Sequence, residues 1–123
     1  MLKKKYGQNF LISDNLAKKI VNLEKIKNKN ILEIGPGNLS LTKHILNNYP
    51  NKFIAVEIDK DLRKNYDDNI CQFISFHNSL KFNEKEYFNN ENFSIISNLP
   101  FNISTKLLTK WISYRINIIA LIV

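Results

Sequence analysis

The chain has 123 residues, enough for one domain and too few for two. Hydrophobic residues make up 44% of it and charged residues 24%, so it can bury a core and has the charge content of a soluble protein. No apolar run approaches the roughly 20 residues of a membrane span, and the start lacks a signal-peptide core, so we expect no membrane partner and a cytoplasmic location. The single Cys71 excludes a disulfide framework, and the isolated His44 and His77 argue against a metal site.

The net charge of +7 and the sequence pI of about 9.5 favour a polyanionic partner, and nucleic acid is the best candidate. Part of this charge can reflect composition, because lysine here accompanies abundant Asn and Ile. Lys3, Lys4 and Lys5 form a short basic tail that either grips RNA phosphates or is merely solvated.

The hydrophobic pattern predicts alternating helices and strands. A first helix is expected from the cap residues Ser13 and Asp14, with one apolar face made of Leu16, Ile20, Leu23 and Ile26. Further helices are predicted at 39–46, 59–66 and 104–112. Strands are predicted at 31–34, 53–58, 71–76, 93–97 and 116–123.

This alternation indicates an α/β fold of Rossmann-like type, with a mostly parallel sheet covered on both faces. Cys71 is expected in the third strand as a small core residue, and the polar segment 81–92 as a surface loop or frayed helix. Trp111 and Tyr114 are expected to pack at a helix end. The chain stops inside its most apolar strand, which suggests a fragment truncated after the fifth strand.

A glycine turn, "EIGPGN" (33–38), follows the first predicted strand, where backbone can approach a ligand closely. Gly35 and Gly37 suit such a loop. Ser40 replaces the third glycine of the dinucleotide fingerprint, which argues against NAD and leaves a dehydrogenase as a minor alternative.

Polar residues also end the next strands. Glu57 follows Gly35 by 22 residues, and a carboxylate there can accept hydrogen bonds from both hydroxyls of a ribose. Asp59 is better explained as the cap of the next helix. Asn78, after the third strand, either contacts a purine edge or is a turn residue.

The stretch "SNLPF" ends the fourth predicted strand, beside the same cleft. The Asn98 side-chain oxygen and the Leu99 carbonyl could accept the two N–H bonds of an adenine amino group and free its lone pair for attack. Pro100 restricts Leu99 to extended conformations, and Phe101 offers a face on which a flipped base can stack.

Four motifs, in this order and spacing, resemble the ribosomal RNA adenine dimethyltransferase family, closest to its small-subunit (16S-type) members and related to the 23S rRNA antibiotic-resistance methylases. They are "GQNFL" (7–11), "EIGPG" (33–37), "VEID" (56–59) and "NLPFNIS" (98–104). The resemblance covers essentially all of the chain. It implies an S-adenosylmethionine-dependent monomer that dimethylates adenine N6 in small-subunit rRNA, with residues 1–123 as an incomplete N-terminal catalytic domain.

The resemblance also implies roles for single residues. Asn9 and Leu11 would line the cofactor site, Gly35 would pass beneath the methionine part, and Glu57 would bind the ribose. Asn98 would lie at the junction of cofactor and substrate.

Two departures from the family pattern matter. The family usually has an acid where this chain has Asn78, so the cofactor's amino group would meet an uncharged acceptor. The family also continues into further strands and a helical RNA-binding domain. A cofactor- or RNA-binding remnant without catalysis is therefore the main alternative, and the target adenines and the number of methyl groups stay open.

Overall fold

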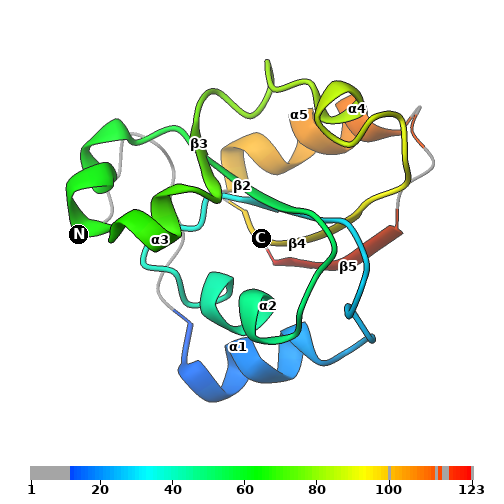
Figure 1. Cartoon of the computed structure of the whole chain (residues 1–123). Helices are drawn as coiled ribbons and strands as arrows, with labels where there is room; N and C mark the ends of the chain where they lie inside the picture. Colours follow the sequence, from blue (N-terminus) through cyan, green and yellow to red (C-terminus); the bar gives the residue numbers. More distant parts are fainter. Residues whose placement is uncertain (1–11, 100, 113, 115–116, 123) are drawn as a thin grey trace.

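The computed structural model describes residues 12–99, 101–112, 114 and 117–122 (Figure 1). The strands are β1 (Ile31–Ile34), β2 (Phe53–Glu57), β3 (Ile74–Phe76), β4 (Ser94–Asn98) and β5 (Asn117–Ile122). The helices are α1 (Asp14–Val21), α2 (Thr42–Asn47), the 3₁₀ helix η2 (Lys60–Asn65), α3 (Asp68–Cys71), α4 (Glu84–Tyr87) and α5 (Phe101–Trp111). No helix among these residues is long and apolar enough to cross a membrane.

The strands form one five-stranded sheet in the order β3-β2-β1-β4-β5, and every neighbouring pair is parallel. This confirms the predicted parallel α/β fold. The chain runs outward from β1 to one edge and then returns to β4 on the other side of β1. The boundary between β1 and β4 is thus the topological switch point, where open α/β sheets place their ligands.

Helices cover both faces of the sheet, α1 and α2 on one and α4 and α5 on the other (Figure 1). Alternate residues of a strand point to opposite faces, so β1 and β2 supply both cores. Ile31 and Ala55 pack with the α1–α2 side, whereas Leu32 and Val56 pack with the α4–α5 side. This explains why both strands are apolar at nearly every position.

The first helix is shorter than predicted. Ser13 caps it by accepting a hydrogen bond from the Leu16 N–H, but it ends at Val21. Its buried face is Ala17, Ile20 and Val21, while Leu16 and Leu23 of the predicted face are exposed. Ile26 is buried, but it reaches the core from the turn beyond the helix.

The region before β4 also differs from the prediction. Cys71 ends the short helix α3 instead of lying in the third strand, and it is only partly buried. Within 81–92, predicted as a surface loop or frayed helix, α4 buries Glu84, and Phe88 is fully inaccessible. Phe88 stacks on Phe93 with ring centroids 4.8 Å apart, so this segment anchors the second core. Trp111, as predicted, is a packing residue and is 1% exposed.

Candidate active site

The two central strands separate just before the predicted motifs. β1 and β4 are paired through Ile31–Ser94 and Leu32–Ile95. Further along, the Ile34 N–H donates to the Ser97 side-chain oxygen at 2.6 Å instead of to a backbone carbonyl. One residue beyond this bond the chain reaches Gly35 on one side and Asn98 on the other, so the glycine turn and the SNLPF motif begin at the switch point.

The glycine turn needs its glycines for their backbone conformation. Gly35 has φ of +70° and Gly37 has φ of +53°, values that residues with a side chain rarely adopt. A Cβ atom on Gly35 would meet no atom within 4 Å. The space above this residue is therefore open, as required for a loop that a ligand approaches closely.

Glu57 holds this turn in place. It ends β2, is 1% exposed, and its two carboxylate oxygens accept the Gly37 N–H at 3.1 Å and the Asp59 N–H at 3.0 Å. Burial raises the pKa of Glu57, and these two hydrogen bonds oppose the rise. The Ile58 N–H is a further backbone donor to this carboxylate, so of its roughly four acceptor positions about one remains for a ligand.

Tyr66 holds the same turn from the other side, a role that the motifs did not predict. Its hydroxyl donates to the Gly37 carbonyl at 2.6 Å, so both ends of this glycine are hydrogen-bonded to side chains from other elements. Burial, followed by the nearby Glu57 carboxylate, raises the pKa of the Tyr66 hydroxyl. The tyrosine therefore stays a neutral donor.

Glu33 is a second buried acid beside Glu57. Burial raises the pKa of Glu33 to about 8; the Thr42 hydroxyl, which donates to it at 2.5 Å, opposes the rise, and the charge on Glu57 adds to it. Backbone N–H groups that donate to Glu57 favour its charged form, whereas Glu33 accepts from a hydroxyl, so Glu33 is the acid of this pair that is more readily protonated. An acid inside the apolar strand "ILEI" was the available sequence signal for this pair.

Two other strand-end residues form turns. Asp59 caps η2 by accepting the Asp61 N–H at 3.1 Å, as predicted. The Asn78 side-chain oxygen accepts the Leu80 N–H at 3.0 Å, which confirms the turn interpretation. An amide oxygen has a second lone pair, so the predicted contact with a purine stays open.

The predicted base-binding residues are only partly described. Asn98 ends β4 and is half-buried, and the Leu99 side chain is fully buried in the α4–α5 core. Leu99 can therefore serve a substrate only through its backbone. The Phe101 backbone begins α5. Pro100, Asn9, Leu11 and the Lys3–Lys5 tail lie outside the described residues.

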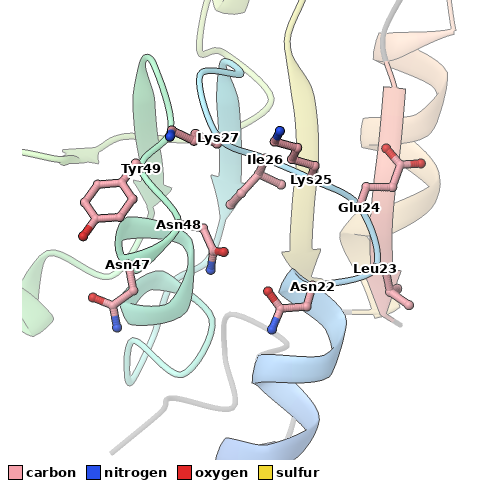
Figure 2. Close-up of a pocket in the computed structure, with 9 residues that line it drawn as sticks. All are labelled: Asn22, Leu23, Glu24, Lys25, Ile26, Lys27, Asn47, Asn48 and Tyr49. Atoms are coloured by element: carbon pink, nitrogen blue, oxygen red, sulfur yellow. The ribbon is translucent and has the colours of Figure 1, made fainter.

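An open cavity of about 450 Å³ lies elsewhere, between the turns that follow α1 and α2. Figure 2 shows its lining residues on these two turns, which lead into the amino-terminal ends of β1 and β2. The glycine turn lies at the opposite, carboxyl ends, so this cavity is not part of the candidate site. The described residues contain no group of three or more His, Cys, Asp or Glu that could hold a metal ion.

Comparison with known proteins agrees with this fold. The family model described as "Ribosomal RNA adenine dimethylase" matches residues 1–123. Solved structures with the same fold include the 23S rRNA methyltransferase ErmE, with a TM-score of 0.72, 19% identity, and coverage of 89% of this chain and 45% of that one. A dimethyladenosine transferase from Plasmodium falciparum has a TM-score of 0.67 and 27% identity, covering 87% of this chain and 39% of the other.

Curated relatives include two proteins named "Ribosomal RNA small subunit methyltransferase A". The one from Pelagibacter ubique is 43% identical over 114 residues, which cover 89% of this chain and 42% of the relative. The one from Mycoplasmopsis pulmonis is 38% identical over 108 residues, covering 88% and 42%. The chain thus spans about two fifths of the length of these relatives. The family match over residues 1–123 shows that the chain belongs to the ribosomal RNA adenine dimethylase family.

Proposed function

We propose that this chain is the S-adenosylmethionine-binding catalytic part of an rRNA adenine N6,N6-dimethyltransferase of the small-subunit type. The observation that carries the proposal is the meeting of the glycine turn, buttressed by Glu57, with Asn98 at the switch point of a fully parallel sheet. We expect it to act as a monomer in the cytoplasm, on the RNA of the small ribosomal subunit, and its net charge of +7 suits that partner.

The residues present fit this cofactor. The open space above Gly35 would admit the methionine part, and Glu57, although it accepts three backbone N–H groups, would offer its remaining acceptor position to a ribose hydroxyl. Asn78 would receive the adenine amino group, and Asn9 and Leu11 would complete the site from the N-terminal segment. When bound, the cofactor supplies a methyl group already activated by its sulfonium, so no strong base is required of the protein.

The remaining task of the protein is to orient the target adenine. The Asn98 side-chain oxygen and the Leu99 carbonyl would accept the two N–H bonds of the exocyclic amine, and this geometry returns the nitrogen lone pair to a nucleophilic direction. The Leu99 side chain is fully buried, so it fixes the backbone at this position and leaves the carbonyl as the group that can bind the amine. Pro100 would preset that carbonyl, and Phe101 would stack on the base.

The test is transfer of labelled methyl groups from S-adenosylmethionine to unmethylated small ribosomal subunits. We expect transfer by the wild-type chain and none by Asn98→Ala. Asn69→Ala, which changes an exposed asparagine on α3, should leave transfer unaffected. Unchanged transfer by Asn98→Ala would remove this residue from the mechanism.

The length of the chain favours a second candidate, a module that binds cofactor or RNA without transferring methyl groups. It spans about two fifths of its relatives, so surfaces that grip RNA in those proteins can lie outside it. Calorimetry with S-adenosylhomocysteine separates the two functions. Binding without transfer supports the second candidate, transfer excludes it, and NADH binding more tightly than S-adenosylhomocysteine contradicts both.

A further inference from the structure

A buried charged cluster lies on the opposite side of the sheet from Glu57, between α4 and the end of α5. The Lys110 ammonium lies 2.7 Å from a carboxylate oxygen of Glu84, as an ion pair, and the indole N–H of Trp111 donates to the other oxygen. Glu84 and Trp111 are each 1% exposed, and the Lys110 side chain is 19% exposed. These three residues are called the latch below.

The latch also holds the loop that follows β3. The same Lys110 ammonium donates to the Ser79 carbonyl at 2.9 Å and to the Phe82 carbonyl at 2.6 Å. The Lys110 ammonium thus donates to two loop carbonyls and forms an ion pair with one buried carboxylate. Lys110 therefore ties both ends of the segment 79–82 to α5.

The clamped segment begins directly after Asn78. The Asn78 side-chain oxygen accepts the Leu80 N–H at 3.0 Å, and its carbonyl accepts the Lys81 N–H at 2.9 Å. The orientation of the Asn78 side chain thus depends on the turn that Lys110 holds. At its other end, α5 starts at Phe101, immediately after the SNLP stretch, so one helix connects the two parts of the proposed site.

We propose that Glu84, Lys110 and Trp111 are positioning residues that fix the loop 78–83 on α5 and thereby set the selectivity for adenine as the base of the cofactor. This inference rests on the proposed function, because it takes Asn78 as the acceptor of the cofactor's amino group. Asn78 carries no charge, so its hydrogen bond depends on geometry alone, and an oriented loop compensates for the missing carboxylate.

The test compares two ligands that differ at the base, S-adenosylhomocysteine and S-inosylhomocysteine. The second has a carbonyl in place of the amino group, so an Asn78 oxygen would oppose it instead of accepting from it. The variant is Glu84→Gln with Lys110→Met, which removes both charges together and leaves no buried charge without a partner. Lys106→Met, on the exposed side of the same helix, is the matched control.

We expect the double variant to bind S-adenosylhomocysteine about fivefold more weakly, the effect of one misplaced hydrogen bond, with the adenosine-over-inosine preference reduced by a similar factor. Lys106→Met should keep both values. A purely structural latch would lower stability and leave this preference unchanged, so an unchanged preference in the folded double variant overturns the proposal.

Amide hydrogen exchange of the ligand-free chain tests the latch without any cofactor. We expect the double variant to exchange faster at the amides of residues 79–83, with β1 and β2 unaffected. Unaltered exchange in this loop overturns the latch, whatever the chain binds. If the wild-type chain binds neither ligand, the proposed function is contradicted. If the wild-type chain and the double variant bind with the same preference for S-adenosylhomocysteine over S-inosylhomocysteine, only the proposed role of the latch is contradicted.

Discussion

The two faces of the sheet bury acidic side chains in opposite ways. On the α1–α2 face, Glu33 and Glu57 lie close together, and no lysine or arginine within the described residues is paired with either of them. On the α4–α5 face, Glu84 is equally buried, but Lys110 neutralises it. On the first face, the buried carboxyl groups are stabilised by protonation and by backbone hydrogen bonds. On the second face, the buried carboxylate is stabilised by an ion pair.

The difference matches the role proposed for each face. The proposed role of Glu57 toward a ligand requires an acceptor position that no cation occupies, and the raised pKa of Glu33 reduces the negative charge beside it. An acid that only joins two elements can be neutralised by a cation, as Glu84 is by Lys110, while the Trp111 indole N–H donates to its other oxygen. The buried acid Glu57 is therefore a candidate ligand-binding group, whereas the buried acid Glu84 connects two structural elements.

The largest effect is expected from breaking the ion pair on one side only. Lys110→Met leaves the Glu84 carboxylate buried without its partner, which should lower the free energy of unfolding by about 3–5 kcal/mol. The double change Glu84→Gln with Lys110→Met should cost much less, because no lone charge remains. Urea denaturation measures both, and a single change no costlier than the double one would contradict the role of the pair.

The acids of the other face should make stability depend on pH. The folded-state pKa of Glu33, about 8, lies above its ordinary value of 4.5, so between these values the folded chain binds more protons than the unfolded chain. Stability should therefore be full below about pH 4.5 and should fall by about 3–4 kcal/mol from pH 5 to pH 8. The raised pKa of Glu57 acts in the same direction.

Glu33→Gln isolates this contribution, since the amide can still accept from Thr42 but does not titrate. Its unfolding free energy, from urea melts at several pH values, should vary less between pH 5 and pH 8 than that of the wild-type chain. Equal slopes for the two proteins would show that Glu33 is charged throughout this range.

Glu57→Gln probes the hydrogen bonds that hold the glycine turn. A glutamine replaces one acceptor oxygen with a donor, which would face the N–H of Gly37 or of Asp59. We expect a loss of about 1–3 kcal/mol of stability and weaker binding of S-adenosylhomocysteine. The exposed Glu86→Gln is the control, and calorimetry that finds equal affinity would exclude Glu57 from the cofactor site.

The smallest effect on stability is expected at Gly35. An alanine there meets no neighbouring atom, so its cost is the positive φ alone, about 1–2 kcal/mol. The added methyl group occupies the open space, and affinity for S-adenosylhomocysteine should fall by tenfold or more, roughly 1.4 kcal/mol. A stability loss without any loss of affinity would place the ligand elsewhere.

Local signals made much of this molecule predictable. Strand and helix alternation, the glycine turn after the first strand and the Asp59 cap each depend on residues close in the sequence, and the structure contains all three. The proximity of Gly35 and Asn98 also followed, because the carboxyl ends of parallel strands share one edge. The roles of these residues toward a cofactor and a base stay predictions.

Long-range contacts were not predictable in the same way. Glu84 lies in a polar segment typical of a surface loop, and only its contact with Lys110, far along the chain, makes it a buried anchor. No sequence pattern indicated the hydrogen bond between Tyr66 and Gly37. Leu23 fits the helical spacing of apolar residues, but the helix ends at Val21. Tertiary packing decides such outcomes, and the spacing of apolar residues along the sequence carries no information about it.

The two hydrogen bonds that hold Gly37, one at its N–H and one at its carbonyl, have a consequence for the kinetics of the proposed ligand binding. Because Glu57 and Tyr66 hold this turn in the free protein, its conformational entropy is lost during folding and not upon binding. A ligand arriving at this edge of the sheet meets a preorganised surface. Its association should follow simple one-step kinetics, without a slow phase in which the turn rearranges.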